Sequence, residues 1–212
     1  MTMKTTEKKP VPVANNLAEL SGNLRKTDPK VTINPKTKVM TRHGDLVLEK
    51  DRTFEHSIVV EGNIVGKYGM RYNLVVNGSI NAKNINAGNI DAWGNINARG
   101  NINAWNIDAR GNIRAGNIDA WNIDAWGNIN TRGNINTQCN INAKNINTCD
   151  INAWGNINTR SNIDARGNIN AKEDIHAGFI LCEKLIQPEG KRLVCRKLIE
   201  ERSTYELKEI KR

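Results

Sequence analysis

An isoleucine recurs every five or six residues through almost half of this 212-residue chain, without a break from Ile80 to Ile180. Each unit reads Asn-Ile-(Asn/Asp)-(Ala/Thr), followed by a variable residue and often by a Gly, Ser or Cys. In an extended strand, the Ile and the small residue two positions later lie on one side, while the intervening Asn or Asp faces the other. Each unit therefore predicts a very short strand with one large and one small inward side chain, ended by a sharp turn.

Strands this short cannot bury their inward faces alone, so they have to stack as coils. Three units add up to one coil, since Ile80 to Ile96 is 16 residues and Ile96 to Ile113 is 17. Steps of 16 are expected to continue upstream in two columns, Leu48 to Ile64 to Ile80 and Ile58 to Leu74 to Ile90. Three short strands and 16–18 residues per coil predict an all-β fold, a single-stranded triangular parallel β-helix. The mixed spacing favours a right-handed coil, because left-handed hexapeptide helices keep strict sixes and pentapeptide helices keep strict fives.

The third residue after each Ile is expected to face outward, and these positions sort onto three faces of the triangle. The candidate interaction surface consists of Arg99, Arg132 and Arg166 on the first face, Trp105, Trp121 and Trp154 on the second, and Trp93 and Trp126 on the third. Because coils lie about 4.8 Å apart, Trp105 and Trp121 are expected to stack directly.

Each of these stripes has two interpretations. Exposed aromatic rings at a regular rise suit the stacking of sugars or bases, but they also cover corners or pack against a neighbouring protomer. The arginines suit phosphate groups, or they form a solvated face balanced by nearby Asp residues. Asp91, Asp108 and Asp124 are expected to form a row one coil apart, which either holds a cation or is neutralised by Arg110.

The formal net charge of +9 is concentrated at the ends of the chain. Residues 80–178 carry 9 basic and 8 acidic side chains, a net of +1, whereas residues 1–44 alone carry 9 basic and 3 acidic ones. We expect residues 1–44 to form a basic, disordered arm or a loose N-terminal cap. Residues 45–186 are expected to form the β-helix, and residues 187–212 the last irregular coil, a C-terminal cap and a charged tail.

The sequence offers no constellation typical of an enzyme. His43, His56 and His176 are scattered, no paired acids mark a cleft, and the cysteines lack metal-ligand spacing. We therefore expect no catalytic residues, no cofactor and no metal. The absence of an apolar leader and of an 18-residue apolar run predicts a cytoplasmic protein without a transmembrane segment, with reduced cysteines. A Cys182–Cys195 bridge stays open as an alternative if adjacent turns stack the two thiols.

The stretches SIVVEGNIVG and NLVVNGSINAKNINAGNIDA resemble the bactofilins, polymer-forming bacterial cytoskeletal proteins, over about residues 56–180. The resemblance implies a right-handed triangular β-helix that assembles end to end without nucleotide, with membrane contact through a short N-terminal tail in some members. The repeats NIDAWGNINARGNINAW look closer still to uncharacterised bacterial and phage-borne repeat proteins. The segment after Ile180 departs from bactofilins and offers a way to cap the coil.

Together these features predict a non-enzymatic structural or scaffolding rod that self-associates, or docks a protein partner, through coil ends or faces. A homo-oligomer or polymer is the expected state. The alternative is a binding module that uses the Trp and Arg stripes to hold nucleic acid or glycan.

Overall fold

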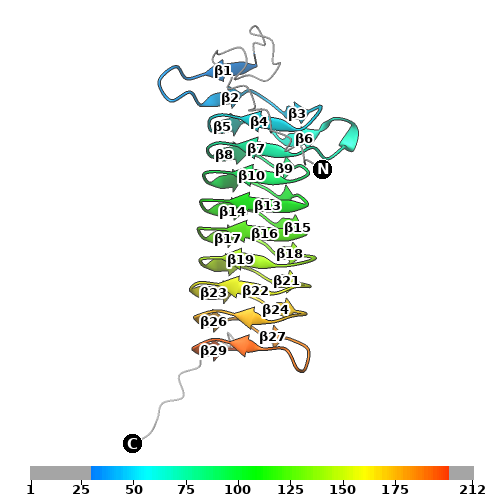
Figure 1. Cartoon of the computed structure of the whole chain (residues 1–212), viewed down its shortest axis with the longest axis vertical. Coiled ribbons are helices and arrows are strands. Elements are labelled where there is room, and N and C mark those ends of the chain that lie inside the picture. Colours follow the sequence, from blue (N-terminus) through cyan, green and yellow to red (C-terminus); the bar gives the residue numbers. More distant parts are fainter. Residues whose placement is uncertain (1–29, 201–212) are drawn as a thin grey trace, which may run out of the picture.

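The computed structural model describes residues 30–200 and shows a parallel β-helix made of three sheets (Figure 1). Sheet A contains, in spatial order, β1 (Val31–Ile33), β2 (Met40–Arg42), β5 (Ile58–Val60), β8 (Ile80–Ala82), β11 (Ile96–Ala98), β14 (Ile113–Ala115), β17 (Ile129–Thr131), β20 (Ile146–Thr148), β23 (Asn162–Ala165), β26 (Phe179–Leu181) and β29 (Lys197–Ile199). Sheet B contains β3 (Leu46–Leu48), β6 (Ile64–Gly66), β9 (Ile85–Asn86), β12 (Ile102–Asn103), β15 (Ile118–Ala120), β18 (Ile135–Thr137), β21 (Ile151–Ala153), β24 (Ile169–Ala171) and β27 (Leu185–Ile186). Sheet C contains β4 (Arg52–Phe54), β7 (Leu74–Val76), β10 (Ile90–Ala92), β13 (Asn106–Ala109), β16 (Asn122–Ala125), β19 (Ile141–Ala143), β22 (Ile157–Thr159), β25 (Ile175–His176) and β28 (Leu193–Val194).

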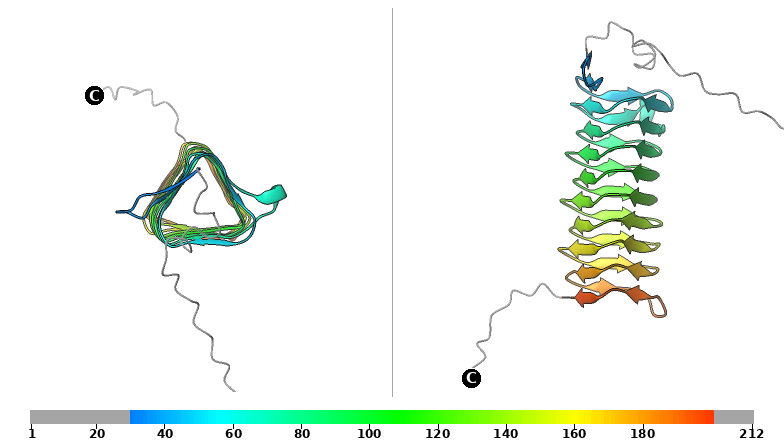
Figure 2. Two further views of the ribbon diagram at one scale, coloured as in Figure 1. Left: turned by 90° about the horizontal axis from the view of Figure 1, so that it is seen from above. Right: turned by 60° about the vertical axis from the view of Figure 1, so that its left-hand side comes forward.

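The chain visits sheets A, B and C in turn, so each coil contributes one strand to each side of a triangle (Figure 2). Nine strands in sheet B and nine in sheet C make nine coils, a rod of about 43 Å at ~4.8 Å per coil. In Figure 1 sheet C faces the viewer, and its strands run leftward as the chain descends from the N-terminal coils. The coil is therefore right-handed, and the predicted triangular parallel β-helix is confirmed.

The core consists of columns of like residues that the strand register places one above another. In sheet A, Ile96 pairs with Ile113 and Ile113 with Ile129, and all three are fully buried. The small residue two positions later also points inward, as Ala or Thr. Where Thr takes this place its hydroxyl finds a partner, as in the 2.7 Å contact between the Oγ1 atoms of Thr131 and Thr148. Large and small columns thus alternate around the inside of the triangle.

The expected upstream columns are wrong, although the fold is not affected. Ile58 pairs with Ile80, 22 residues later, rather than with Leu74, and Ile64 pairs with Leu46 and Ile85. The step from Leu74 to Ile90 holds. The reason is an excursion between β6 and β7, which contains the 3-10 turn η1 (Lys67–Gly69) and lengthens that coil. The 16-residue spacing upstream was partly a coincidence of sequence.

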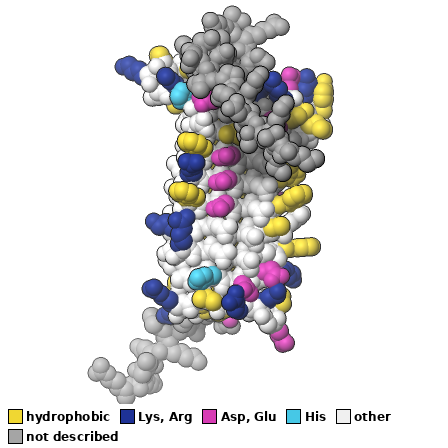
Figure 3. Space-filling model, in the orientation of Figure 1, with side chains coloured by type: hydrophobic (Ala, Val, Ile, Leu, Met, Phe, Trp, Pro, Cys, Tyr) yellow, Lys and Arg dark blue, Asp and Glu magenta, His cyan; other side chains and the backbone are white. Residues whose placement is uncertain are grey.

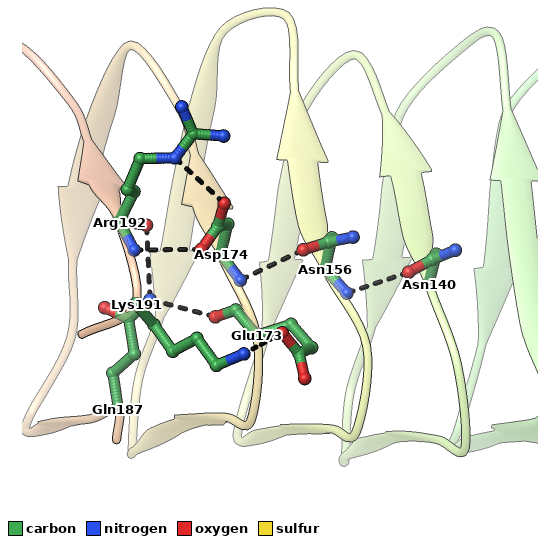
Figure 4. Close-up of polar contacts among 7 residues, drawn as sticks. All are labelled: Asn140, Asn156, Glu173, Asp174, Gln187, Lys191 and Arg192. Atoms are coloured by element: carbon green, nitrogen blue, oxygen red, sulfur yellow. Dashed lines mark hydrogen bonds and ion pairs between the residues drawn. The ribbon is translucent and has the colours of Figure 1, made fainter. Parts of the chain in front are cut away.

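Asparagine ladders hold the corners of the triangle together. The side-chain oxygen of Asn117 accepts a hydrogen bond from the backbone N–H of Asn134 in the next coil at 2.7 Å, and Asn101 does the same for Asn117 at 3.1 Å. Gly133 is required beside this ladder, because a Cβ atom there would collide with Asn117 Oδ1. Near the C-terminal end, Asp174 continues such a ladder and receives both the backbone N–H and the guanidinium of Arg192 (Figure 4).

The two ends of the described rod differ. Residues 30–44, within the expected arm or cap, form a hairpin in which β1 runs antiparallel to β2, and β2 joins sheet A parallel to β5. The rest of the expected arm, residues 1–29, lies outside the described residues, as does the charged tail from residue 201. At the other end, residues 187–200 add β28 and β29, so the last coil is completed within the segment expected to be irregular.

Truncation of one core isoleucine tests the column model. Ile129→Ala removes a fully buried side chain between Ile113 and Ile146. We expect the free energy of unfolding to fall by about 3 kcal/mol, the usual cost of a cavity of this size. Urea denaturation followed by circular dichroism measures it. The exposed neighbour Asn130→Ala should change it by less than ~0.5 kcal/mol, and equal losses for both variants would contradict the register.

Candidate functional site

The candidate residues lie in the turns at the three corners of the triangle, which we call corner AB, corner BC and corner CA after the sheets they join. Arg99, Arg132 and Arg166 follow sheet A strands and lie in corner AB. Trp105, Trp121 and Trp154 follow sheet B strands and lie in corner BC, and Trp93 and Trp126 follow sheet C strands and lie in corner CA. The structure therefore keeps the basic stripe and the main Trp stripe on different edges of the rod.

In corner AB the arginine side chains extend along the rod rather than away from it. Arg132 Nη2 donates a 2.7 Å hydrogen bond to the carbonyl of Arg99, two coils away, and Arg166 Nη2 donates to the carbonyl of Arg132 at 2.8 Å. The intervening corner residues are Gly116 and Cys149, which are small enough to let the guanidinium pass. Arg132 and Arg166 thus link alternate coils, a structural role that the sequence pattern did not predict. The alternation of arginine with small residues was its signal.

In corner BC the predicted stacking of Trp105 on Trp121 is confirmed. The ring centroids are 6.2 Å apart and the ring planes are inclined by 28°. Trp105, Trp121 and Trp154 keep 39%, 49% and 70% of their surface exposed. Trp154 is separated from Trp121 by the coil that carries Gln138. The corner therefore presents an aromatic pair and a third ring further along the same edge.

In corner CA, Arg110 occupies the position one coil after Trp93. The guanidinium of Arg110 lies 4.0 Å from the centre of the Trp93 ring, within the range of a cation–π interaction. One coil further on, Trp126 is exposed, and its carbonyl accepts a hydrogen bond from Arg160 Nη2 at 3.4 Å. Rings in this corner are thus interleaved with cationic side chains, unlike those in corner BC.

The predicted acidic row is present on sheet C. The strand register aligns Asp91, Asp108 and Asp124 on β10, β13 and β16. Figure 3 shows acidic side chains in a line on this face, flanked along one edge by basic and hydrophobic groups. Partial desolvation on the face of the sheet and the neighbouring carboxylates Asp91 and Asp124 raise the pKa of Asp108, whose side chain is exposed. Arg110 acts in the opposite direction but does not outweigh them. The row is therefore only partly neutralised by the arginine beside it.

Two shallow grooves lie beside these stripes. One of about 950 Å³ follows corner CA toward the C-terminal end, with Asp124, His176, Arg160 and Arg196 among its polar lining residues. A smaller one of about 340 Å³ on sheet A brings Arg99, Arg114 and Arg132 together. Arg114 was not among the sequence candidates, because it occupies an outward strand position, one residue after its Ile, rather than a corner.

Within residues 30–200 no group of three or more His, Cys, Asp or Glu side chains is arranged to hold a metal ion. The four cysteines form no disulfide, so the alternative Cys182–Cys195 bridge is absent; Cys182 is buried and Cys195 is half-buried. The described part of the chain contains no helix long and apolar enough to span a membrane.

Comparison of the chain with protein-family models, with curated proteins and with solved structures found no match in any of the three. By its fold, the protein belongs to the class of parallel β-helix repeat proteins.

The acidic row gives a prediction with a defined pH dependence. Asp108→Asn removes a carboxylate that repels its two neighbours, and Asn already fills the same column at positions 142 and 158, where Asn158 donates to Asn142 at 3.1 Å. We expect the variant to be more stable at neutral pH by about 0.5 kcal/mol. Because the folded state raises the pKa of Asp108, the gain should disappear as the pH falls through that pKa.

Urea denaturation at several pH values measures this gain. Asp119→Asn is the matched control, since its partners in sheet B are Asn103 and Asn136 and the change relieves no repulsion within that column. A gain of equal size in both variants, or a gain that grows at acid pH, would contradict the proposed repulsion.

Proposed function

We propose that the chain is a non-enzymatic structural rod of the cytoplasm that associates with further copies through the ends of its coils, as the resemblance to bactofilins implies. The observation that carries the proposal is the C-terminal coil. Within the described residues β27, β28 and β29 are the last strands of their sheets, and each is hydrogen-bonded to one neighbouring strand. A strand edge of this kind is a template for another strand.

The register identifies which groups this edge offers. Along the rod, the N–H of each core Ile donates to the coil that follows, as Ile80 N does to Asn95 O at 2.8 Å and Ile175 N does to Arg192 O at 2.9 Å. Leu198 in β29 occupies the equivalent position, aligned with Ile180. By the same geometry its N–H points away from the rod, toward the place of a further coil. Ile186, Leu193 and Val194 add exposed apolar surface to this coil.

One part of the edge is already covered. In sheet B the outward N–H of Leu185 donates to Glu200 Oε1 at 2.7 Å, so the glutamate side chain takes the place of the next coil. At the other end of the rod, antiparallel β1 covers the first parallel strand of sheet A. Association through the C-terminal end is therefore expected to use sheets A and C and to compete with Glu200 in sheet B.

Leu198→Pro tests the proposal directly. Proline removes the outward N–H while keeping an apolar side chain, and no bond to β26 depends on this N–H in the register of the rod. We expect assembly to weaken by about tenfold, the value of roughly one backbone hydrogen bond. Multi-angle light scattering across concentrations, with negative-stain images of the full chain, measures the assembly.

Leu198→Val is the matched control, because it keeps the N–H, and it should assemble like the parent chain. Glu200→Ala should act in the opposite direction and promote assembly by freeing Leu185 N–H. A parent chain that stays a discrete monomer at every concentration, or a Leu198→Pro variant that assembles as well as Leu198→Val, would exclude association through this edge.

A second candidate function is a binding module that holds a ligand on the corners of the rod. The specific observation in its favour is the exposed stack of Trp105 and Trp121. The arginines of corner AB support it less, because Arg132 and Arg166 already donate to backbone carbonyls. Ionic strength separates coil-end association from nucleic-acid binding, since phosphate binding weakens steeply as salt rises and pairing of strand edges does not. Joint substitution of Trp105 and Trp121 separates it from glycan binding, because this removes the stacked rings and leaves the coil ends unchanged.

A further inference from the structure

We propose that corner BC is a binding strip for a linear, uncharged glycan chain, with Trp105, Trp121 and Trp154 as its stacking rings. The inference rests on the second candidate function and names its ligand. It is independent of association through the coil ends, because corner BC runs along the side of the rod.

The arrangement of the corner favours a long ligand. Gly88 occupies the corner position one coil before Trp105, so that coil adds no corner side chain of its own, and the Arg71 side chain crosses it to reach Asn103. The strip lies between two loops that follow sheet B strands, one containing η1 after β6 and the other after β27, and Figure 1 shows both protruding on the same side. From Gly88 to Lys172 the corner spans five coil steps, roughly 24 Å at ~4.8 Å per step. An extended oligosaccharide fits such a length.

The chemistry of the strip favours an uncharged ligand. Beside the rings, sheet B presents the amides Asn103, Asn136 and Asn152 together with a single acid, Asp119. The Asn152 amide donates to Asn136 Oδ1 at 3.0 Å, so these amides form an oriented polar row next to the rings. The cationic side chains Arg71 and Lys172 lie only at the two ends of the strip, whereas a nucleic acid would require such groups along its length for its phosphates. Aromatic faces beside amide groups match a sugar chain, which offers apolar C–H faces and hydroxyl groups.

The upper end of the strip is pre-ordered. Arg71, in the loop after η1, reaches past the coil of Gly88, and its Nη2 donates to Asn103 Oδ1 at 2.7 Å. Tyr68 in the same loop is almost fully exposed. This contact fixes the loop against the strip and sets the amide of Asn103 beside Trp105.

The test is a titration of the full chain with cellohexaose, hexa-N-acetylchitohexaose and maltohexaose, all uncharged, followed by intrinsic tryptophan fluorescence and by calorimetry. We expect at least one hexasaccharide to bind, with little dependence on salt. Trp121→Ala should weaken it by about tenfold, the loss of one stacking ring, and Trp121→Phe should restore most of the affinity. Trp126→Ala in corner CA is the matched control and should leave the affinity within about twofold.

The inference would be overturned if no hexasaccharide bound, or if Trp121→Ala and Trp126→Ala lost equal affinity. Salt-sensitive binding of oligo(dT) in place of the sugars would also overturn it, as would a fluorescence change that follows protein concentration without sugar. The last would indicate that the strip contacts a second copy. Light scattering of the same samples reports separately on association through the coil ends, so failure of one proposal is distinguishable from failure of the other.

Discussion

Through the regular part of the rod, core isoleucines lie above isoleucines and most corner asparagines above asparagines, and the remainder of the structure depends on this stacking of like on like. Parallel strands in register make the stacking possible, since equivalent residues recur one coil apart. The inward columns remove apolar surface from water, and the asparagine ladders satisfy the backbone N–H groups that the sharp corners would otherwise leave without partners. The same register that favours neutral columns places carboxylates beside one another, and Asp91 and Asp124 add to the desolvation that raises the pKa of Asp108.

The repeat was sufficient to predict the fold class, the number of strands per coil and the stacking of Trp105 on Trp121, because a column of identical residues has one self-consistent register. The coils near the N-terminus were harder to predict. There the apolar residues are Leu, Val and Ile without the complete Asn-Ile-(Asn/Asp)-(Ala/Thr) unit, so the spacing aligns Ile58 with Leu74 instead of Ile80. The loop between β6 and β7 has no repeat of its own in the sequence, so it becomes evident only from the pairing of strands in the structure.

The sequence predicts which residues of the candidate surface face outward, and the structure shows where their side chains extend. Arg132 and Arg166 were chosen as outward residues, yet their guanidinium groups extend along the rod to backbone carbonyls. This orientation depends on Gly116 and Cys149 in the intervening coils, a relation between residues about 17 positions apart that no short motif encodes. The contact of Arg71 with Asn103 and the groove that Arg114 shares with Arg99 and Arg132 are not predicted for the same reason, because both depend on which side chains the coils bring together.

The links that skip a coil have a consequence for how such a rod lengthens or shortens. If one coil were duplicated or lost, every isoleucine and asparagine column would close again, and the core would be unchanged in kind. The arginine-to-carbonyl hydrogen bonds of corner AB would not form again in this way. Removal of the coil of Gly116 would place Arg132 directly against Arg99, with no small residue between them. Gain or loss of coils in pairs preserves the alternation, so duplication in units of two coils is the change of length that this architecture accommodates most readily.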